Sequence, residues 1–227
     1  DTDTSRDAGS SSASRQTYIS GKAVQRAAEN LRIYLDKKGF PGGDKLTDVC
    51  RRDKDLPSLV FDGYFDPPAG TVDPVTSQGS PYGTYAFATH LSEVNVEEIT
   101  GICSVKRVYA AHDVGRAINV HNIKGQICGG VAMGIGFALM EEFVPGRTES
   151  LDTYYLPTSA DMPEIEALII ENHEPTGPFG AKGVGEPGLI PQAASIVNAI
   201  CDATGVRPFR LPVDMERLKK LLGKKRE

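Results

Sequence analysis

Residues 122–143 read NIKGQICGGVAMGIGFALMEEF. Apolar residues recur in this stretch at four-residue steps, which predicts a helix with one buried face. The same stretch contains glycines at positions 125, 129, 130, 134 and 136. Each glycine costs about 1 kcal/mol relative to alanine in a helix interior, about 5 kcal/mol in all. A helix with this cost has something packed against its backbone, and the sequence leaves open whether that is a neighbouring element or a ligand.

Strand patterns lie on both sides of this helix. Residues 85–96 alternate between apolar and polar, a Thr100-Gly101 turn follows, and residues 102–111 are rich in β-branched side chains. These features predict a hairpin. Further strands are expected at 57–64 and about 167–171. Apolar periodicity predicts helices at 13–35, 187–204 and about 212–224, of which the last is basic. The fold class is therefore α+β, with hairpins or a mixed sheet packed against several helices.

Composition narrows the classes of protein to which the chain can belong. Of 227 residues, 24 are glycine and 15 proline, and the excess is concentrated in the helix above, in a long connection at about 66–84 and in residues 174–188. The net charge of −5 argues against a nucleic-acid-binding surface. No apolar run has the length of a membrane span. We therefore expect neither nucleic acid nor a membrane as a partner.

Cysteine and histidine spacing gives no metal signature. The four cysteines, at positions 50, 103, 128 and 201, never occur as a CxxC pair, and the four histidines are scattered. We expect reduced, mostly buried thiols in a cytoplasmic protein, and no metal site built from protein side chains.

Residues 174–188 read EPTGPFGAKGVGEPG and present one carboxylate, Glu186. Residues 183–188 formally match GxGxxG, but no apolar strand precedes them, so a dinucleotide site is not expected. Pro187 suits the first position of a helix, which would place Glu186 at the helix N-terminus, where the dipole favours its ionised form. Glu186 is then either a general base beside a bound group or a helix cap in a tight turn.

The start of the first helix can bind an anion. Residues Ala13, Ser14, Arg15, Gln16 and Thr17 follow a serine-rich segment, and the first N–H groups of a helix point outward. The alternative is ordinary N-capping by Ser11 or Ser12. Gln126, on the glycine-rich helix, can donate and accept hydrogen bonds. Three aromatic residues either contact a substrate or pack in the core, namely Tyr82, Tyr85 and Phe179.

Three segments together resemble the molybdenum hydroxylase family, the xanthine dehydrogenase and aldehyde oxidoreductase group. They are DTDTSRDAGSSSASRQTY (1–18), AHDVGRAINVHNIKGQICGGVAMGIGFALMEE (111–142) and GPFGAKGVGEPGLIPQAASIVNAI (177–200). The resemblance implies that residues 1–227 are the C-terminal portion of a larger molybdopterin-binding domain.

The resemblance also implies roles for individual residues. Glu186 stands at the catalytic glutamate and Gln126 at a glutamine near the molybdenum. Residues 13–17 match the loop that holds the pterin. Arg15 and Gln16 stand where the family has small or hydroxyl side chains, so main-chain N–H groups carry that contact. Molybdenum is held through the pterin dithiolene, and no protein side chain ligates it.

The implied reaction is hydroxylation of an electron-poor carbon with oxygen from water, and xanthine or a related purine is the favoured substrate. Nicotinate-like heterocycles, aromatic thioesters and aldehydes are alternatives. Iron–sulfur clusters and FAD are expected on other domains or subunits, together with the rest of the molybdenum domain, so the isolated chain is expected to be inactive. Two different functions stay open: a non-catalytic scaffold or assembly domain, and a nucleotide-binding module built on residues 183–188.

Overall fold

The computed structural model describes residues 3–4, 6–40, 42–43, 45–56 and 59–226. The chain forms two compact units. The first unit comprises Asp1–Tyr85 and His173–Gly183, and the second comprises Ala86–Asn172 and Val184–Glu227.

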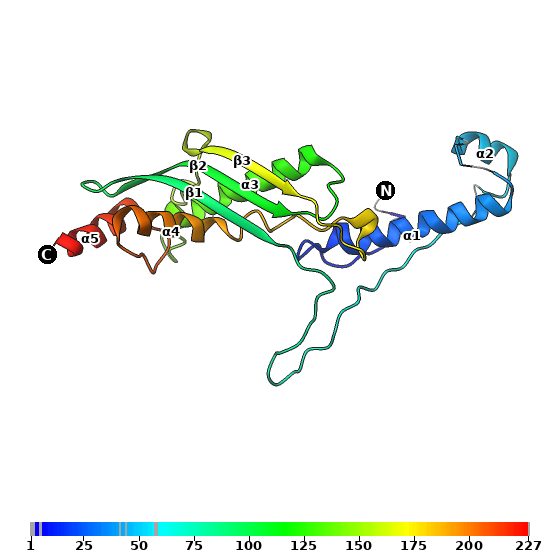
Figure 1. Cartoon of the computed structure of the whole chain (residues 1–227), viewed down its shortest axis with the longest axis horizontal. Coiled ribbons are helices and arrows are strands. Elements are labelled where there is room, and N and C mark those ends of the chain that lie inside the picture. Colours follow the sequence, from blue (N-terminus) through cyan, green and yellow to red (C-terminus); the bar gives the residue numbers. More distant parts are fainter. Residues whose placement is uncertain (1–2, 5, 41, 44, 57–58, 227) are drawn as a thin grey trace. The chain divides into compact units, whose positions relative to one another are not determined.

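A three-stranded mixed sheet forms the centre of the second unit (Figure 1). Strands β1 (Ala88–Glu97) and β2 (Ile102–Asp113) pair antiparallel, and β3 (Glu164–Ile170) pairs parallel with β2 on its other side. The hairpin predicted around Gly101 is confirmed, and the third strand begins three residues earlier than its sequence pattern indicates. Gly101 has φ 81°, which a turn with left-handed backbone requires.

A β-bulge divides the hairpin. Glu93 pairs with Arg107, but Val94 pairs with Val105, so Lys106 is an extra residue on β2. A strand alternates its side chains between two faces, and one inserted residue reverses that alternation. As a result Val105 and Val108, which are three positions apart, are both buried. The bulge thus keeps both halves of β2 in one hydrophobic core.

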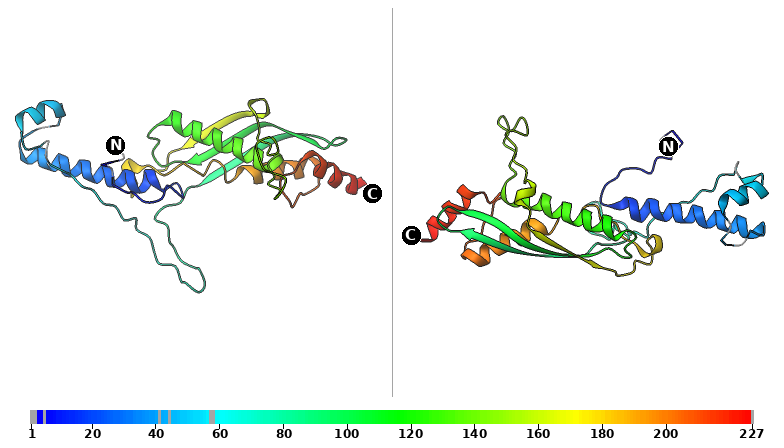
Figure 2. Two further views of the ribbon diagram at one scale, coloured as in Figure 1. Left: turned by 180° about the vertical axis from the view of Figure 1, so that it is seen from behind. Right: turned by 90° about the horizontal axis from the view of Figure 1, so that it is seen from above.

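Two helices, α3 (Val120–Leu139) and α4 (Gln192–Thr204), pack on the sheet and on each other. Seen from behind, α3 lies in front of the strands (Figure 2). Asn119 begins α3 by accepting a hydrogen bond from the N–H of Asn122, 3.0 Å away. A third helix, α5 (Met215–Arg226), contacts β2. The most deeply buried apolar residues of this core are Val108, Ala110, Ile127, Val131, Ala138, Ile196, Ile200 and Leu218.

Helix α4 begins later than Pro187, where the sequence pattern places its start. Residues 187–191 form turns, and Gln192 is the first helical residue. Gly188 explains the delay, because its Cα carries no side chain and lies against the backbone of α3. A Cβ on Gly188 would be 3.2 Å from the Cα of Ile127. Packing of backbone on backbone therefore overrides the local preference of proline for a helix start.

The first unit is built around α1 (Arg15–Lys37), which confirms the first predicted helix. Tyr18, buried on α1, meets the ring of Phe65 edge-on at a centroid distance of 5.5 Å. A short helix, α2 (Leu46–Arg52), adds a second small cluster with Leu35, Val49 and Leu56. The 3-10 turn η3 (Pro178–Gly180) packs on α1, where Pro178 lies beside Gly21.

The strand expected at 57–64 is wrong for residues 59–64, and residues 57–58 lie outside the described residues. Residues 59–64 run along α1, whose side chains satisfy their carbonyl groups. Arg26 Nη1 donates to the carbonyl of Tyr64 at 2.5 Å, and Asn30 Nδ2 donates to that of Asp62 at 2.8 Å. Helix side chains thus supply the hydrogen bonds that a neighbouring strand would give.

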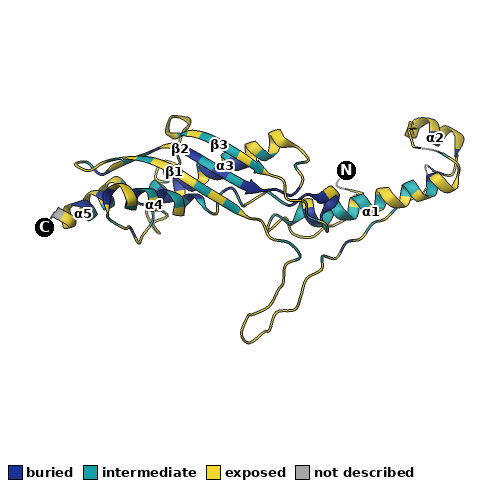
Figure 3. Cartoon of the chain, in the orientation of Figure 1, coloured by how far each residue is buried: buried dark blue, intermediate teal, exposed yellow. Residues whose placement is uncertain are grey.

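The long connection predicted at about 66–84 is present and is mostly exposed (Figure 3). Its tip is held by one isolated bridge between Val72 and Gly79 and by a turn in which Asp73 accepts from the N–H groups of Val75 and Thr76. No helix in the described part of the chain is both long and apolar enough to cross a membrane.

Candidate active site

The turn that carries Glu186 lies on the exposed side of α3 in the second unit. Gln126 Nε2 donates to the carbonyl of Gly185 at 2.6 Å, and the carbonyl of Glu186 accepts from the N–H of Leu189 at 3.0 Å. The side chains of Gln126 and Glu186 are both exposed. The structure therefore brings two of the sequence-predicted site residues together, through the main chain of the turn.

Close packing explains three of the five glycines of α3. A Cβ on Gly130 would lie 2.4 Å from the carbonyl carbon of Gly188 and 2.7 Å from the nitrogen of Leu189. A Cβ on Gly134 would lie 2.4 Å from the Cβ of Gln192, and one on Gly136 would meet the carboxylate of Glu141. At these three positions the glycines let other parts of the chain approach α3. The element packed on the helix backbone is here a neighbouring segment and not a ligand.

The other two glycines of α3 have no such partner. Among the described residues, outside the neighbouring helical backbone, no heavy atom lies within 4 Å of a Cβ built on Gly125 or Gly129. Both glycines are exposed, and they flank Gln126 along the helix. Packing within the chain therefore leaves this part of the glycine cost unexplained.

Glu186 does not stand at a helix N-terminus, because α4 begins six residues later. The prediction that a helix dipole favours its ionised form is therefore wrong. The turn, the hydrogen bond from Gln126 and the contact of Gly188 with α3 position this carboxylate instead.

Residues 13–17 lie in the first unit and begin α1 in an unusual way. Ala13 and Ser14 have φ angles of 52° and 55°, in the left-handed region. The N–H of Arg15 donates to the carbonyl of Ser12 at 3.1 Å. Within the described residues, the N-cap Ser14 makes no side-chain cap hydrogen bond. Ser12 thus meets the start of the helix through its carbonyl, and the following N–H groups of the first turn are the donors that an anion would meet.

Arg15 and Gln16 use their side chains to hold the serine-rich segment before the helix. Arg15 Nη1 donates to the carbonyl of Ser10 at 3.1 Å, and Gln16 Nε2 donates to the same carbonyl at 3.2 Å. These side chains therefore bind the chain's own backbone. On the other side, a Cβ on Gly183 would lie 1.9 Å from the carbonyl of Ser14, so only glycine fits there.

The model of the molybdopterin cofactor-binding domain matches residues 1–163, which is more than half of the chain. The chain belongs to the molybdopterin cofactor-binding domain family. This confirms the resemblance to the molybdenum hydroxylases and the expectation of molybdopterin as the cofactor.

Two relatives and one solved structure agree with the family. Aldehyde oxidoreductase of Megalodesulfovibrio gigas is 36% identical over 96% of this chain and 24% of its own length. A putative xanthine dehydrogenase molybdenum-binding subunit of Escherichia coli (strain K12) is 30% identical over 91% of this chain and 30% of its own. The structure of aldehyde oxidoreductase from Desulfovibrio gigas superposes with a TM-score of 0.88 at 34% identity, over 98% of this chain and 24% of that one. The chain thus spans about a quarter to a third of these relatives, and the α+β fold is confirmed.

Each unit has a feature that fits a molybdopterin cofactor. In the second unit, bare helix backbone at Gly125 and Gly129 flanks the exposed amide of Gln126. In the first unit, the first turn of α1 has N–H donors of the kind that bind phosphate groups. Among the described residues, no group of three or more histidine, cysteine or acidic side chains could hold a metal ion.

The aromatic residues considered for substrate contact are exposed. Tyr82, Tyr85 and Phe179 are 60%, 51% and 58% exposed. The alternative of core packing is therefore wrong. Tyr82 and Tyr85 meet edge to face at a centroid distance of 6.0 Å, and Phe179 has a left-handed backbone with φ 52°. All three belong to the first unit.

A half-buried acidic network in the first unit was not predicted from the sequence. The carboxylate of Glu174 accepts from the hydroxyls of Thr84 and Thr176, both at 2.6 Å. Burial acts to raise the pKa of Glu174, but these hydrogen bonds and the charge of Lys182 bring it below its ordinary value. Lys182 Nζ donates to the carbonyl of Tyr85 at 2.8 Å. The network ties the start of the glycine-rich segment to the end of the long connection.

A second network, in the second unit, joins two histidines to α4. His90 Nε2 lies 2.7 Å from His112 Nε2, and His90 Nδ1 lies 2.7 Å from Gln192 Oε1. His112 is 1% exposed and Gln192 is fully buried. Burial lowers the pKa of His112 to about 4, helped by the neighbouring His90, and burial also lowers the pKa of His90. The bulge at Lys106 decides how these strand residues align, and no sequence signal marks it.

The histidine pair predicts a loss of stability on the acid side of neutrality. A histidine whose pKa is lower in the folded than in the unfolded state favours folding above pH 6.5, and that contribution is lost as pH falls toward 4. We expect the thermal midpoint of the complete enzyme to fall between pH 6.5 and 4.5, and this slope to be reduced in His112→Gln. Differential scanning calorimetry measures it. The exposed His121 provides the matched control: an equal loss of slope in His121→Gln would contradict the assignment.

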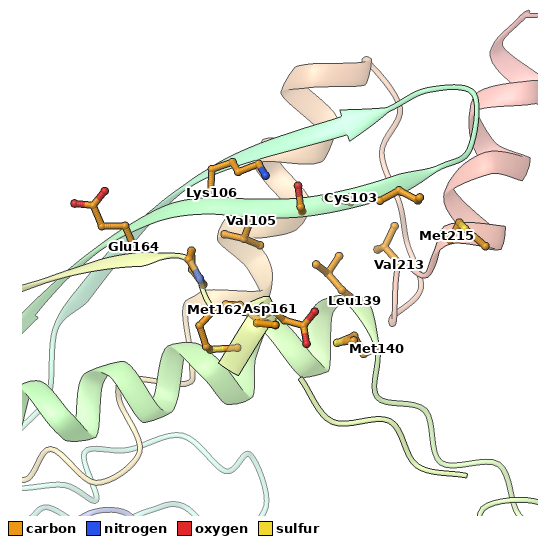
Figure 4. A pocket seen from close by; sticks show the side chains of 15 residues that line it. Cys103, Val105, Lys106, Leu139, Met140, Asp161, Met162, Glu164, Val213 and Met215 are labelled. Carbon is orange, nitrogen blue, oxygen red and sulfur yellow. The ribbon is translucent and has the colours of Figure 1, made fainter. Parts of the chain in front are cut away.

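A cavity of about 450 Å³ lies at the other end of α3 (Figure 4). It lies between the start of β2 and residues 160–164, and three of the four methionines line it. Leu139 at this cavity is 13 residues along the helix from Gln126, about 20 Å at 1.5 Å per residue. The cavity contains none of the predicted site residues. Its lining methionines are Met140, Met162 and Met215.

The four cysteines are less buried than the sequence analysis predicts. All four are free and half-buried, so the expectation of mostly buried thiols is wrong in degree. Burial raises the pKa of Cys103 to about 11, which keeps this thiol at the cavity protonated at neutral pH. A protonated thiol is a poor nucleophile.

Proposed function

We propose that residues 1–227 are the C-terminal portion of the molybdenum cofactor domain of a hydroxylase, in which Glu186 is the general base. The observation that supports this proposal is the turn around Glu186, held by Gln126 and by the backbone contact of Gly188 with α3. A carboxylate carried by a turn with fixed backbone, beside uncovered helix backbone, is suited to accept a proton from a bound group. A scaffold domain has no need of such an arrangement.

Each predicted site residue has a role in this proposal. Gln126 holds the turn and places an amide beside the cofactor, while the N–H groups of Gln16 and Thr17 bind the anionic end of the pterin. When bound, molybdopterin supplies the oxygen that is transferred and accepts the electrons of the reaction. The chain has no role in the onward passage of electrons, for which we propose iron–sulfur and FAD domains or subunits as partners.

The proposed substrate is xanthine or a related purine, oxidised at an electron-poor carbon. Exposed Tyr82, Tyr85 and Phe179 could stack on a flat heterocycle. One relative is named an aldehyde oxidoreductase and another a putative xanthine dehydrogenase subunit, so an aldehyde is the main alternative. Nicotinate-like heterocycles and aromatic thioesters are further alternatives.

The reaction class can be tested with labelled oxygen. We expect the complete enzyme, over many turnovers, to place ¹⁸O from labelled water in the product, and to take up none from labelled O₂. Mass spectrometry of the product, with xanthine, nicotinate, benzaldehyde and an aromatic thioester assayed in parallel, identifies both the oxygen source and the preferred substrate. An enzyme loaded with molybdenum that converts none of these substrates would favour the scaffold function.

A further inference from the structure

The pair of buried His112 and half-buried His90 is one end of a chain of hydrogen bonds. The Oε1 atom of Gln192 can only accept, so His90 Nδ1 carries the proton that it donates there. A neutral His90 then accepts at Nε2, and His112 Nε2 is the donor. With His90 neutral, these two contacts assign both tautomers. These two donations run from β2 through β1 to α4.

The chain continues through two serines and closes on the backbone of α4. Gln192 Nε2 donates to Ser92 Oγ at 3.1 Å, and Ser92 Oγ lies 2.6 Å from Ser195 Oγ. Ser195 Oγ donates in turn to the carbonyl of Gln192 at 3.0 Å. Strand β1 thus holds the side chain of Gln192 directly, and its main chain through Ser195 of α4. Among the described side chains, no buried polar atom is left without a hydrogen-bond partner.

Gln192 is where this network meets the Glu186 turn. Its N–H donates to the carbonyl of Leu189 at 3.2 Å, and the N–H of Leu189 donates to the carbonyl of Glu186 at 3.0 Å. On its other side the Gln192 side chain fills the space left by Gly134 of α3. Two hydrogen bonds therefore separate the buried network from the main chain of Glu186.

Three contacts hold the turn that carries Glu186. Gln126 holds the carbonyl of Gly185 before Glu186, the backbone of α3 supports Gly188 after it, and the buried Gln192 fixes the end of the turn. We propose that Gln192 and His90 are positioning residues for Glu186, which set where its carboxylate lies without contacting substrate or cofactor. This inference rests on the proposed role of Glu186 as base.

Positioning residues matter because the rate of proton transfer depends steeply on the distance and orientation of the reacting groups. A misplacement of about 1 Å caused far from the chemistry can lower the rate about 10²-fold. Surrounding side chains with fixed rotamers prevent such a misplacement. Gln192 is fully buried, whereas Glu186 is exposed, so Gln192 is the more rigidly packed of the two.

The test compares two substitutions of His90 in the complete enzyme. His90→Gln can keep both contacts, because its Oε1 accepts from His112 and its Nε2 donates to Gln192. His90→Leu loses both. We expect His90→Leu to lower kcat per bound molybdenum at least tenfold with KM unchanged, and His90→Gln to restore it to within about twofold of the native value. Hydrogen exchange of the amides at 185–192 should be faster in His90→Leu only. If His90→Leu does not accumulate, Ser92→Ala replaces it, with an expected loss of at least threefold.

The control separates positioning from stability. Ile200→Val removes one methyl group from the buried face of the same helix, which lowers stability without touching the network. It should leave kcat per molybdenum unchanged. Equal losses in Ile200→Val and His90→Leu, or native kcat and native exchange in His90→Leu, would overturn the inference. A Glu186→Gln variant that keeps its activity would instead overturn the role of Glu186, while the exchange data would still show whether His90 holds the turn.

Discussion

Replacing Glu186 by glutamine is expected to abolish turnover of the complete molybdenum enzyme while its molybdenum content stays the same. Glutamine has the same shape as glutamate but cannot accept a proton at neutral pH. A positioned general base contributes about 10²–10⁴-fold to a rate. Because Glu186 is exposed and Gln126 holds the turn through the carbonyl of Gly185, the substitution should leave the turn in place. Steady-state kinetics and metal analysis of the same preparation measure the two quantities.

A matched control comes from β3. Glu166 is exposed on that strand, so Glu166→Gln makes the same change of charge and shape away from the turn. Its kcat should stay within about twofold of the native value. A Glu186→Gln enzyme that retains more than about a tenth of the native kcat would show that another group takes the proton. A parallel loss of molybdenum would show that Glu186 serves the binding of the cofactor.

Sequence patterns predicted well the helices and strands that bury one face. The glycine-rich helix and the hairpin around Gly101 are examples, because apolar residues recur in them at the period of a helix or a strand. The bulge at Lys106 was not predictable, since one inserted residue leaves the composition of β2 unchanged. The alignment of His90 with His112 depends on that bulge, so their network could not be found from the sequence.

The start of α4 shows why local signals failed at the site itself. Pro187 favours a helix start, but Gly188 must lie on the backbone of α3, and no single-segment pattern contains that contact. The same holds for residues 59–64, whose strand pattern gives no sign that Arg26 and Asn30 of α1 bind their carbonyls. Residues 13–17, Gln126 and Glu186 were found through the motifs of a family, and the cofactor contacts assigned to them stay predictions.

A single methyl group on Gly130 is expected to disturb both stability and activity. Its Cβ would lie 2.4 Å from the carbonyl carbon of Gly188, and backbone on both sides leaves no flexible side chain to yield. Overpacking of this kind costs about 1–3 kcal/mol, of which the better helix propensity of alanine offsets about 1. We expect Gly130→Ala to lower the thermal midpoint of the complete enzyme and to lower kcat per molybdenum at least tenfold, because the Glu186 turn must move.

Gly129→Ala is the matched comparison, one residue away on the same helix. No described atom of the chain opposes its Cβ, so helix propensity alone should raise stability by up to about 1 kcal/mol. If Gly129 leaves room for the cofactor, the same methyl group should lower the molybdenum content of the enzyme despite that gain. Calorimetry and metal analysis separate the two effects. A more stable Gly129→Ala enzyme with full molybdenum would show that its bare backbone does not serve the cofactor, and the cost of that glycine would then need another cause.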